Sequence, residues 1–331
     1  MGVKLRDLVE PTEITLESLS GKTLAVDAMN TIFQFLSIIR QPDGTPLMDS
    51  HGEVTSHLSG LFFRTARMIE TGIRPIYVFD GIAPLAKSKT QRERQERKEE
   101  AAVKYEKAKE AGDEEAMRKY AQQTSQLTKA MIEDSKKLLR AMGVPCVQAP
   151  GEGEAQAAAM CRSGQVYSVA SQDYDSLMFG SPRLIRNLSI TGRRKVPRQN
   201  RFINVVPELI ELDKFLSALR ITQLDLIKMG LLVGTDYNPG GIRGIGPKKA
   251  LKAVKENRFD ELSPDSQWLI ELFTNPDIDE AKIERPAFDA DGIVELMCAK
   301  HDYGEERIRK AIDELIEAGK KGKQQGLGEF F

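Results

Sequence analysis

Seven acidic side chains stand where the predicted structural elements of this sequence begin or end. Three predicted strands deliver an aspartate at their ends: Asp27 in "KTLAVD", Asp80 in "RPIYVFD" and Asp173 in "VASQDYDSL". The full set is Asp27, Asp80, Glu152, Glu154, Asp173, Asp175 and Asp236. If these acids converge in a partly desolvated crevice, their repulsion requires divalent cations to neutralise it. Oxygen ligands without His or Cys suit Mg²⁺ or Mn²⁺, and two such ions can stabilise both oxygens of a phosphodiester displacement.

Each acid also has an ordinary explanation, which the segment "APGEGEAQAAAM" illustrates. Its two glutamates could complement the positive end of a helix macrodipole. Residues spaced i, i+2 do not face each other on a regular helix. A shared site therefore needs Glu152 in the lead-in turn and Glu154 in the first helical turn, a bend that Gly151 and Gly153 permit. The segment alone favours capping, whereas the joint pattern of several segments favours a metal site.

Short apolar runs alternate with amphipathic helical patterns along the chain. "KTLAVD" precedes "AMNTIFQFLSIIR", and "VPCVQA" precedes "EAQAAAMCR". This alternation predicts an α/β fold, with a mainly parallel central sheet flanked by helices. In such sheets the ligand crevice lies outside the carboxyl ends of the strands, which is where the aspartates fall.

Composition narrows the class of protein. The chain has 331 residues, 40% of them hydrophobic, and a net charge of −1, so only local charge asymmetry can indicate a partner. No apolar run approaches the roughly 18 residues of a membrane span, and "MGVKLRDLV" lacks the apolar core of a signal peptide. We therefore expect an intracellular protein with no membrane partner. The three cysteines and three histidines show no zinc spacing, which leaves carboxylates as the plentiful metal ligands.

Two segments suggest contacts with nucleic acid. Residues 86–130 are charged and alanine-rich; they fit either a solvated helical pair or a mobile functional element that begins with the basic run "KSKTQRERQERK". "GIRGIGPKKALKAV" resembles the helix-hairpin-helix pattern GxGxxxA. Its Gly244 and Gly246 would let the backbone approach phosphates, and Lys248 and Lys249 would add charge without reading sequence.

Taken together, the motifs resemble the flap endonuclease 1 family of structure-specific 5′ nucleases, in its archaeal form. The matching segments are "GKTLAVDAMNTIFQFLSIIRQ", "GEVTSHLSGLFFRT", "RPIYVFDG", "APGEGEAQAAAM", "SQDYDSLMFG" and "GTDYNPGGIRGIGPKKA". The resemblance implies that the seven acids are ligands, direct or through water, of two Mg²⁺ ions. It also implies that Lys87 and Arg94, at the base of a helical arch, contact the scissile phosphate.

The same resemblance predicts the domain organisation and the DNA contacts. A single nuclease domain would span 1–322, with the arch at about 86–130 and a helix-hairpin-helix-type region at about 222–257. The predicted DNA-binding residues are Phe33, Arg40, Gly244, Gly246, Lys248 and Lys249. Related members often carry a tyrosine that stacks on a base where this chain has Phe33, whose aromatic face keeps that role. Packing with Leu36 on an apolar helix stripe is the alternative for Phe33.

The last nine residues, 323–331, form a candidate partner-binding tail. Gln324, Leu327, Phe330 and Phe331 fit the box that docks onto a DNA sliding clamp of the proliferating cell nuclear antigen type. A few buried anchors of this kind suit tethering at modest affinity. The sequence stops at the box, whereas eukaryotic members continue into a basic tail. We therefore expect a cytoplasmic, nucleoid-associated archaeal protein, and a nuclear one if the source is eukaryotic.

The sequence thus predicts a Mg²⁺-dependent 5′ flap endonuclease with 5′-3′ exonuclease activity, acting as a monomer on branched DNA. Its roles would be Okazaki fragment maturation and base excision repair. One alternative is a related mismatch-repair or excision-repair 5′ nuclease, although the latter typically carries a far longer insertion. Another is a non-catalytic, clamp-tethered DNA-binding scaffold, which would gain nothing from seven repelling acids.

Overall fold

A central seven-stranded sheet organises the chain. The computed structural model describes residues 3–41, 44–81, 88–124, 126–190, 192–195 and 202–327. The strand order is β1-β9-β6-β5-β2-β3-β4, and β7 and β8 form a separate two-stranded sheet. The strands are β1 (Thr12–Glu13), β2 (Thr23–Asp27), β3 (Arg74–Phe79), β4 (Cys146–Gln148), β5 (Ser168–Ala170), β6 (Arg183–Arg186), β7 (Gly192–Lys195), β8 (Phe202–Val205) and β9 (Glu208–Glu211).

The predicted mainly parallel sheet is confirmed. Strand β2 lies at its centre and pairs in parallel with both β3 and β5, while β4 and β6 extend the parallel arrangement outward. At one edge β9 runs in the opposite direction, so its pairings with β6 and with β1 are antiparallel. Because β2, β3 and β5 are parallel neighbours, their carboxyl ends meet at one edge of the sheet.

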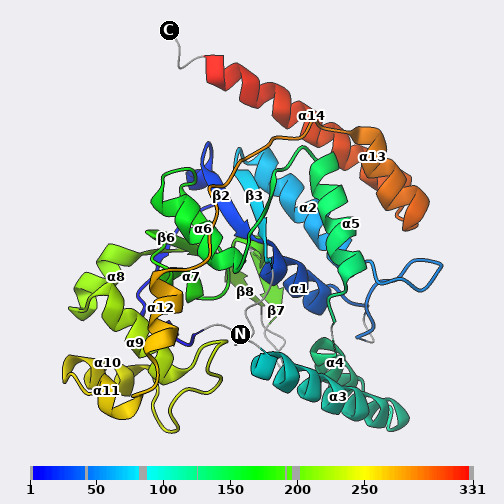
Figure 1. Ribbon diagram of the computed structural model, residues 1–331. Helices are drawn as coiled ribbons and strands as arrows, with labels where there is room; N and C mark the ends of the chain where they lie inside the picture. The colour runs from blue at the N-terminus through cyan, green and yellow to red at the C-terminus, as the bar shows by residue number, and fades with distance from the viewer. Residues whose placement is uncertain are drawn as a thin grey trace.

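Helices cover both faces of the sheet (Figure 1). The α-helices are α1 (Ala28–Ile38), α2 (Ser56–Glu70), α3 (Ser88–Glu110), α4 (Glu114–Gln123), α5 (Lys129–Ala141), α6 (Gly153–Arg162), α7 (Asp175–Met178), α8 (Leu212–Leu219), α9 (Gln223–Val233), α10 (Pro247–Lys255), α11 (Phe259–Leu262), α12 (Gln267–Thr274), α13 (Ala290–Val294) and α14 (Glu305–Leu327). Short 3₁₀ helices occupy Arg6–Leu8, Glu17–Leu19 and Leu188–Ile190, and a π-helical segment spans Glu295–Lys300.

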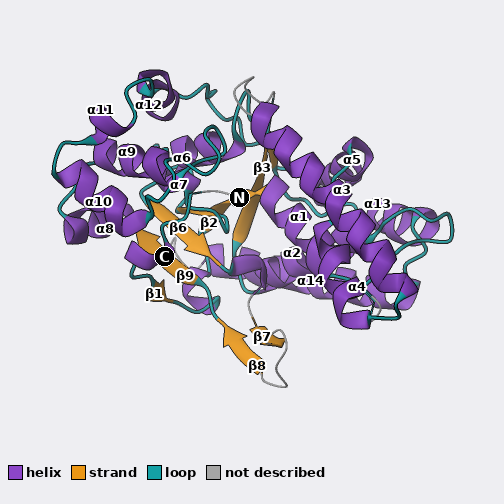
Figure 2. Cartoon of the chain, turned by 90° about the horizontal axis from the view of Figure 1, so that it is seen from below, coloured by secondary structure: helices purple, strands orange, loops and turns teal. Residues whose placement is uncertain are grey.

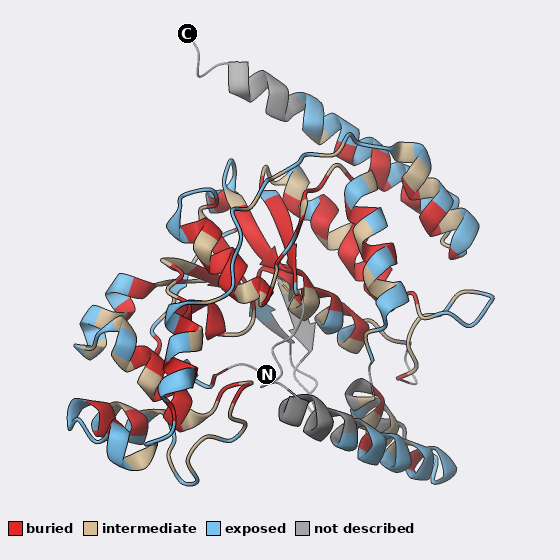
Figure 3. Cartoon of the chain, in the orientation of Figure 1, coloured by how far each residue is buried: buried red, intermediate tan, exposed pale blue. Residues whose placement is uncertain are grey.

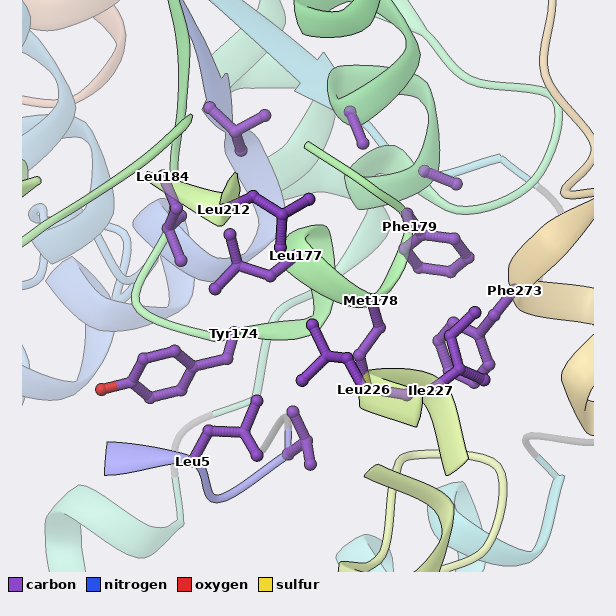
Figure 4. Packing of buried hydrophobic residues seen from close by; sticks show 14 of the residues in the cluster. Leu5, Tyr174, Leu177, Met178, Phe179, Leu184, Leu212, Leu226, Ile227 and Phe273 are labelled. Atoms are coloured by element: carbon purple, nitrogen blue, oxygen red, sulfur yellow. The ribbon is translucent and has the colours of Figure 1, made fainter. Parts of the chain in front are cut away.

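Alternation along the central strands divides the interior into two hydrophobic clusters. On β3, Ile76 and Val78 face one cluster, whereas Tyr77 and Phe79 face the other. This is the period-2 pattern of a strand buried on both sides. The first cluster joins the sheet to α6, α7, α9, α10 and α12, and Figure 4 shows Met178 and Phe179 packed with Ile227 and Phe273. The second cluster lies under α1, α2, α5, α13 and α14.

The predicted helical insertion is present as the pair α3 and α4. The pair projects from the body of the protein and is mostly exposed where its side chains are described (Figures 2 and 3). Its small buried residues are Ala101, Ala108 and Ala121, so alanines rather than large apolar side chains pack between these helices. Alanine side chains bury little apolar area, so the two helices gain little burial energy from their own interface.

The helix-hairpin-helix-type region is formed by α9, a glycine-rich loop and α10. Helix α9 begins with a capping box between Thr222 and Asp225. Helix α10 begins at Pro247, with Gly246 as its N-cap. Within the loop, Gly241 has a φ of 52°, and a Cβ atom there would lie 2.3 Å from the Leu232 carbonyl oxygen. The loop that carries Asp236 therefore closes back on α9 only with glycine at this position.

Helix α14 packs on α2 through its first half and then runs outward toward the C-terminus (Figure 1). Ile308, Ile312 and Leu315 are its buried contacts. The predicted boundary of the tail at residue 323 falls inside α14, which continues to Leu327. Lysine and glutamine are good helix formers, so this polar segment can extend the helix without a core beneath it. Within the described residues, no helix has the length and apolarity needed to cross a bilayer.

A polar cluster, which we call the histidine cluster and which is exposed only at its lysine, joins three distant segments. It consists of His57, His301, Asp49, Asp134 and Lys300. The His301 Nδ1 atom lies 2.8 Å from Asp49 Oδ2, and its Nε2 atom lies 3.4 Å from Asp134 Oδ2. Lys300 Nζ donates to Asp134 Oδ2 at 2.7 Å. The cluster therefore fastens the end of the π-helical segment to α5 and to the loop before α2.

Candidate active site

Three strand ends bring aspartates to one edge of the sheet. Asp27 is the last residue of β2 and also the N-cap of α1, where its Oδ1 atom accepts from the Asn30 amide at 3.0 Å. Asp80 directly follows β3, whereas Asp173 and Asp175 lie just beyond β5. Since β2 pairs with both β3 and β5, the sheet places all three groups at the edge predicted from the sequence.

The start of α6 carries the two glutamates, one before the helix and one in its first turn, as a shared site requires. Glu152 is the N-cap of α6, and Glu154 lies in its first turn. Between them, the Gly153 amide donates to Asp80 Oδ1 at 2.8 Å. A Cβ atom on Gly153 would stand 2.7 Å from the same oxygen, so glycine allows this close approach.

Asp175 is held by the start of the chain. It begins α7, is 6% exposed, and accepts a hydrogen bond of 2.6 Å from the Val3 amide to its Oδ1 atom. Val3 and Leu5 are themselves buried in the first hydrophobic cluster. The N-terminal segment thus fixes the position of one acid of the site from a distance of 172 residues.

Burial and mutual repulsion raise the pKa of three of these acids. Burial, followed by the charge of Asp80, raises the pKa of Asp27 to about 7. Burial and the charge of Asp173 raise the pKa of Asp175 to about 7. The pKa of Glu154 is raised well above its usual range by burial and by Asp175. These shifts are the signature of carboxylates placed close together with too little solvent to screen them.

Hydrogen bonds rather than cations hold the aspartates in place. Among the described residues, no ion pair neutralises Asp27, Asp80, Glu154, Asp173 or Asp175. Instead, Asn30 Nδ2 donates to Asp173 Oδ2 at 2.9 Å, and the Ser171 hydroxyl donates to Asp27 Oδ2 at 3.0 Å. In the part of the chain that the structure describes, no three His, Cys, Asp or Glu side chains stand close enough to hold a metal ion as they are.

Asp236 approaches the same edge from the loop after α9. Its charge contributes to the raised pKa of Asp175, which places it in electrostatic reach of the other acids. The neighbouring Tyr237 is buried, and burial together with the charge of Glu152 raises the pKa of its hydroxyl. All seven predicted acids therefore approach the same edge of the sheet, drawn from five separate segments of the chain.

The predicted DNA-binding residues differ in their exposure to solvent and in their local contacts. Phe33 is 40% exposed while Leu36 is 3% exposed, so Phe33 lies at the border of the buried stripe of α1 with part of its ring open to solvent. Arg40 is half-buried and donates to the carbonyl oxygens of Ser37 and Gly44, which braces the loop after α1. Gly244 has a φ of 82° with open space around it, a backbone shape that glycine readily adopts.

Gly246 is likewise open, and Lys248 and Lys249 are exposed at the start of α10. Lys249 also donates from Nζ to the Gly244 carbonyl oxygen at 2.9 Å, so it has a local structural contact. Lys87, Phe330 and Phe331 lie outside the described residues. Arg94 belongs to α3, and Gln324 and Leu327 belong to α14. The structure describes the backbone of these three residues but not their side chains.

Sequence reasoning missed Asn30, Ser171 and Tyr237 as members of the site. A signal was present for two of them. Asn30 is three residues after Asp27, the spacing at which an N-cap carboxylate meets a backbone amide. Ser171 precedes Asp173 by two residues, a spacing at which a serine hydroxyl can meet a backbone amide. The histidine cluster gave no local signal, because its members are separated by up to 252 residues.

Comparison with known proteins agrees with this geometry. Residues 1–101 match the XPG N-terminal domain, and residues 143–236 match the XPG I-region. The chain is 51% identical over 338 residues to flap endonuclease 1 of Pyrococcus abyssi, which covers 100% of this chain and 98% of that one. Flap endonuclease 1 of Aeropyrum pernix is 50% identical over 349 residues, and the match covers 100% of both chains.

Solved structures show the same architecture. Flap endonuclease-1 from Methanococcus jannaschii superposes with a TM-score of 0.77 at 39% identity, over 96% of this chain and 98% of that one. The catalytic core of Rad2 in complex with DNA shares the fold, with a TM-score of 0.68 at 22% identity over 94% of this chain and 97% of that one. The chain belongs to the flap endonuclease 1 family and is a structure-specific nuclease that hydrolyses phosphodiester bonds of DNA.

Proposed function

We propose that the seven acids at the carboxyl edge of the sheet hold two Mg²⁺ ions, which Mn²⁺ can replace, for the cleavage of 5′ flaps. The observation that carries this proposal is that the pKa values of Asp27, Glu154 and Asp175 are raised at this edge, where no described cation is paired with them. Such an arrangement destabilises the metal-free protein, and a function that requires cations explains why the chain has it.

The donor set fits hard divalent cations. The acids offer only oxygen ligands, and Ser171, Asn30 and Tyr237 around them are neutral oxygen or amide groups. Mg²⁺ keeps several waters when it binds proteins, so the acids need not close around it in a group of three. When bound, two ions would neutralise charge on the attacking and leaving oxygens of the phosphodiester.

The remaining residues would position the DNA. We infer that the exposed ring of Phe33, six residues beyond Asp27 on α1, stacks on a base next to the crevice. Lys87 and Arg94 would supply positive charge to the scissile phosphate from the base of the helical arch. The loop around Gly244 and Gly246, with Lys248 exposed beside it, would hold duplex through its phosphates. Selectivity then comes from the shape of the junction rather than from base readout.

We propose the C-terminal residues as a sliding-clamp tether. The support is the sequence pattern of Gln324, Leu327, Phe330 and Phe331. Helix α14, which carries the first two of them, runs away from the body of the protein (Figure 1). The F330A/F331A variant should lose stimulation by the clamp and retain clamp-free cleavage, because tethering raises local concentration without altering the crevice. We also propose that the protein acts as a monomer in the compartment that holds the chromosome.

The experiment that tests the proposed function compares three labelled substrates with and without Mg²⁺. A 5′ flap should be cut near its junction, with blunt duplex trimmed slowly from its 5′ end and a bubble left largely intact. Preference for the bubble would instead identify an excision-repair type of nuclease. Binding of all three without Mg²⁺-dependent cleavage would identify a DNA-binding scaffold.

A further inference from the structure

Two neutral side chains, Asn30 and Ser171, each connect Asp27 with Asp173. Asn30 donates from its backbone amide to Asp27 Oδ1 at 3.0 Å and from its side-chain amide to Asp173 Oδ2 at 2.9 Å. The Ser171 hydroxyl donates to Asp27 Oδ2 at 3.0 Å, and the Asp173 amide donates to the same hydroxyl oxygen at 3.2 Å. The four residues therefore form a closed ring of hydrogen bonds, which we call the amide-hydroxyl frame.

The frame rests on rigid elements. Asn30 lies in the first turn of α1, for which Asp27 is the N-cap. Ser171 follows β5 and is 5% exposed, and its backbone amide donates to the Ile185 carbonyl oxygen at 3.2 Å. Neither side chain can rotate away without leaving a partly buried carboxylate oxygen without a donor. The frame therefore fixes both the orientation of the two carboxylates and the distance between them.

The geometry also shows which acid the Ser171 hydroxyl serves. A hydroxyl carries one hydrogen, and its oxygen lies 3.0 Å from Asp27 Oδ2 but 3.4 Å from Glu154 Oε1. Asp27 therefore has a donor on each of its oxygens, and Asp173 has one on Oδ2. Each oxygen keeps a second lone pair, so a cation can still be bound. Groups that hydrogen-bond to metal ligands orient those ligands and raise the affinity for the metal.

We propose that Asn30 and Ser171 are positioning residues, which hold Asp27 and Asp173 in the arrangement that binds divalent ions. This inference rests on the proposed function, in which Asp27 and Asp173 are metal ligands. Neither residue touches the substrate in this role. Their loss should therefore weaken metal binding, whereas the rate at saturating metal should recover.

The test uses three substitutions within the frame. Ser171→Ala removes the hydroxyl, Ser171→Thr retains it, and Asn30→Leu removes the side-chain amide with little change in volume. Calorimetric titration with Ca²⁺, in the absence of DNA, measures binding directly. The Mg²⁺ concentration for half-maximal flap cleavage gives a second readout. Melting curves recorded in EDTA identify a temperature at which every variant is folded, and the binding and cleavage measurements are made at that temperature.

We expect Ser171→Ala and Asn30→Leu to weaken Ca²⁺ binding and raise the half-maximal Mg²⁺ concentration by about 10- to 100-fold. Ser171→Thr should stay within a few-fold of the wild type in both measurements. Ser189→Ala is the matched control, because the Ser189 hydroxyl donates to the amide oxygen of Gln34, one turn beyond Asn30, and not to an acid of the frame. It should leave metal binding unchanged.

A fourth variant, Asp173→Asn, separates this inference from the proposed function. If Asp173→Asn binds Ca²⁺ like the wild type, the proposed metal site itself is wrong. If Asp173→Asn loses binding while Ser171→Ala and Asn30→Leu keep wild-type affinity, the metal site stands and the positioning role is overturned. A lowered rate of the two frame variants at saturating Mg²⁺, with unchanged metal affinity, would also overturn it.

Discussion

The molecule contains two groups of closely spaced ionisable side chains, and they are built in opposite ways. In the histidine cluster, Asp49 and Asp134 face His301 and Lys300, and hydrogen bonds to these partners help to lower the pKa of both aspartates. At the carboxyl edge of the sheet, acids face other acids, and the pKa values of Asp27, Glu154 and Asp175 rise. In the first group each aspartate has a hydrogen-bond donor within the fold, whereas acids that face other acids need a ligand to explain them.

The largest effect should come from Asp175→Asn. The amide keeps the shape and can still accept from the Val3 amide, but it lacks the charge needed to hold a cation. We expect flap cleavage in Mg²⁺ to fall by about a thousandfold, because the ions contribute several kcal/mol to transition-state stabilisation. Single-turnover cleavage measures the rate.

Melting in EDTA supplies the other half of that test. The variant should be at least as stable as the wild type, since it removes a repelling charge from the crevice. Wild-type turnover combined with a lower melting temperature would show that Asp175 supports the fold rather than the chemistry.

The second prediction concerns pH and His57. Both ring nitrogens of His57 are buried without a hydrogen-bond partner among the described residues, and burial lowers its pKa to about 4. Because the unfolded value is near 6.5, the stabilisation is complete above pH 6.5 and is lost as the pH falls toward 4. The loss should reach roughly 3 kcal/mol at pH 4.

Denaturant unfolding of the wild type and of His57→Leu at several pH values checks this sign. The difference in free energy of unfolding between the two proteins should shift in favour of the variant as the medium becomes more acidic. A difference that stays constant from pH 7 to pH 4 would show that the imidazole does not remain neutral in the folded protein.

The third prediction concerns an aspartate whose loss should lower stability rather than the cleavage rate. Asp134→Asn removes the charge that pairs with Lys300 and His301 in the histidine cluster. We expect a loss of about 2 kcal/mol in the free energy of unfolding, the magnitude of a charged hydrogen bond. The cleavage rate should change far less than in Asp175→Asn.

Glu133→Gln, on the same helix, is the control for that variant. Glu133 is 59% exposed in its ion pair with Lys136, so its removal should alter stability by less than about 1 kcal/mol. Equal destabilisation by the two variants would mean that the histidine cluster gains nothing from burial.

The smallest effect should come from an exposed cation that belongs to neither group. Lys248→Ala at the start of α10 should weaken duplex binding and reduce the slope of log affinity against log salt by about 1. Fluorescence anisotropy between low and moderate salt measures that slope. Lys214→Ala is the comparison, because Lys214 is exposed on α8 and paired with Glu211. An equal change in both variants would remove the case for a phosphate contact at Lys248.

The positions of site residues could be predicted where a short segment of sequence determines them. Asp27, Asp80 and Asp173 follow apolar strands, and parallel pairing alone places such residues at one edge. The position of Glu152 before α6 followed from its spacing to Glu154 and from the flanking glycines. The exposure of Phe33 could not be decided, because the apolar stripe of α1 includes Leu36 and its exact angular limit depends on what packs against it.

Contacts between distant segments were beyond local patterns. Nothing near Asp175 indicates that the Val3 amide is its partner, and nothing near His301 indicates Asp49. The extent of α14 was also missed, because a polar segment of lysine and glutamine reads equally well as a loop or as an exposed helix. These features depend on the tertiary fold rather than on periodicity.

The separation of the acids along the chain has a consequence for protein synthesis. The first acid is residue 27 and the last is residue 236, and the amide that steadies Asp175 belongs to residue 3. At translation rates of 5 to 20 residues per second, roughly 10 to 40 s pass between the appearance of the first and the last acid. A nascent or prematurely terminated chain therefore lacks the complete set of acids throughout that interval. If cleavage needs the proposed two-ion site, the order of the polypeptide itself keeps unfinished copies from cutting DNA.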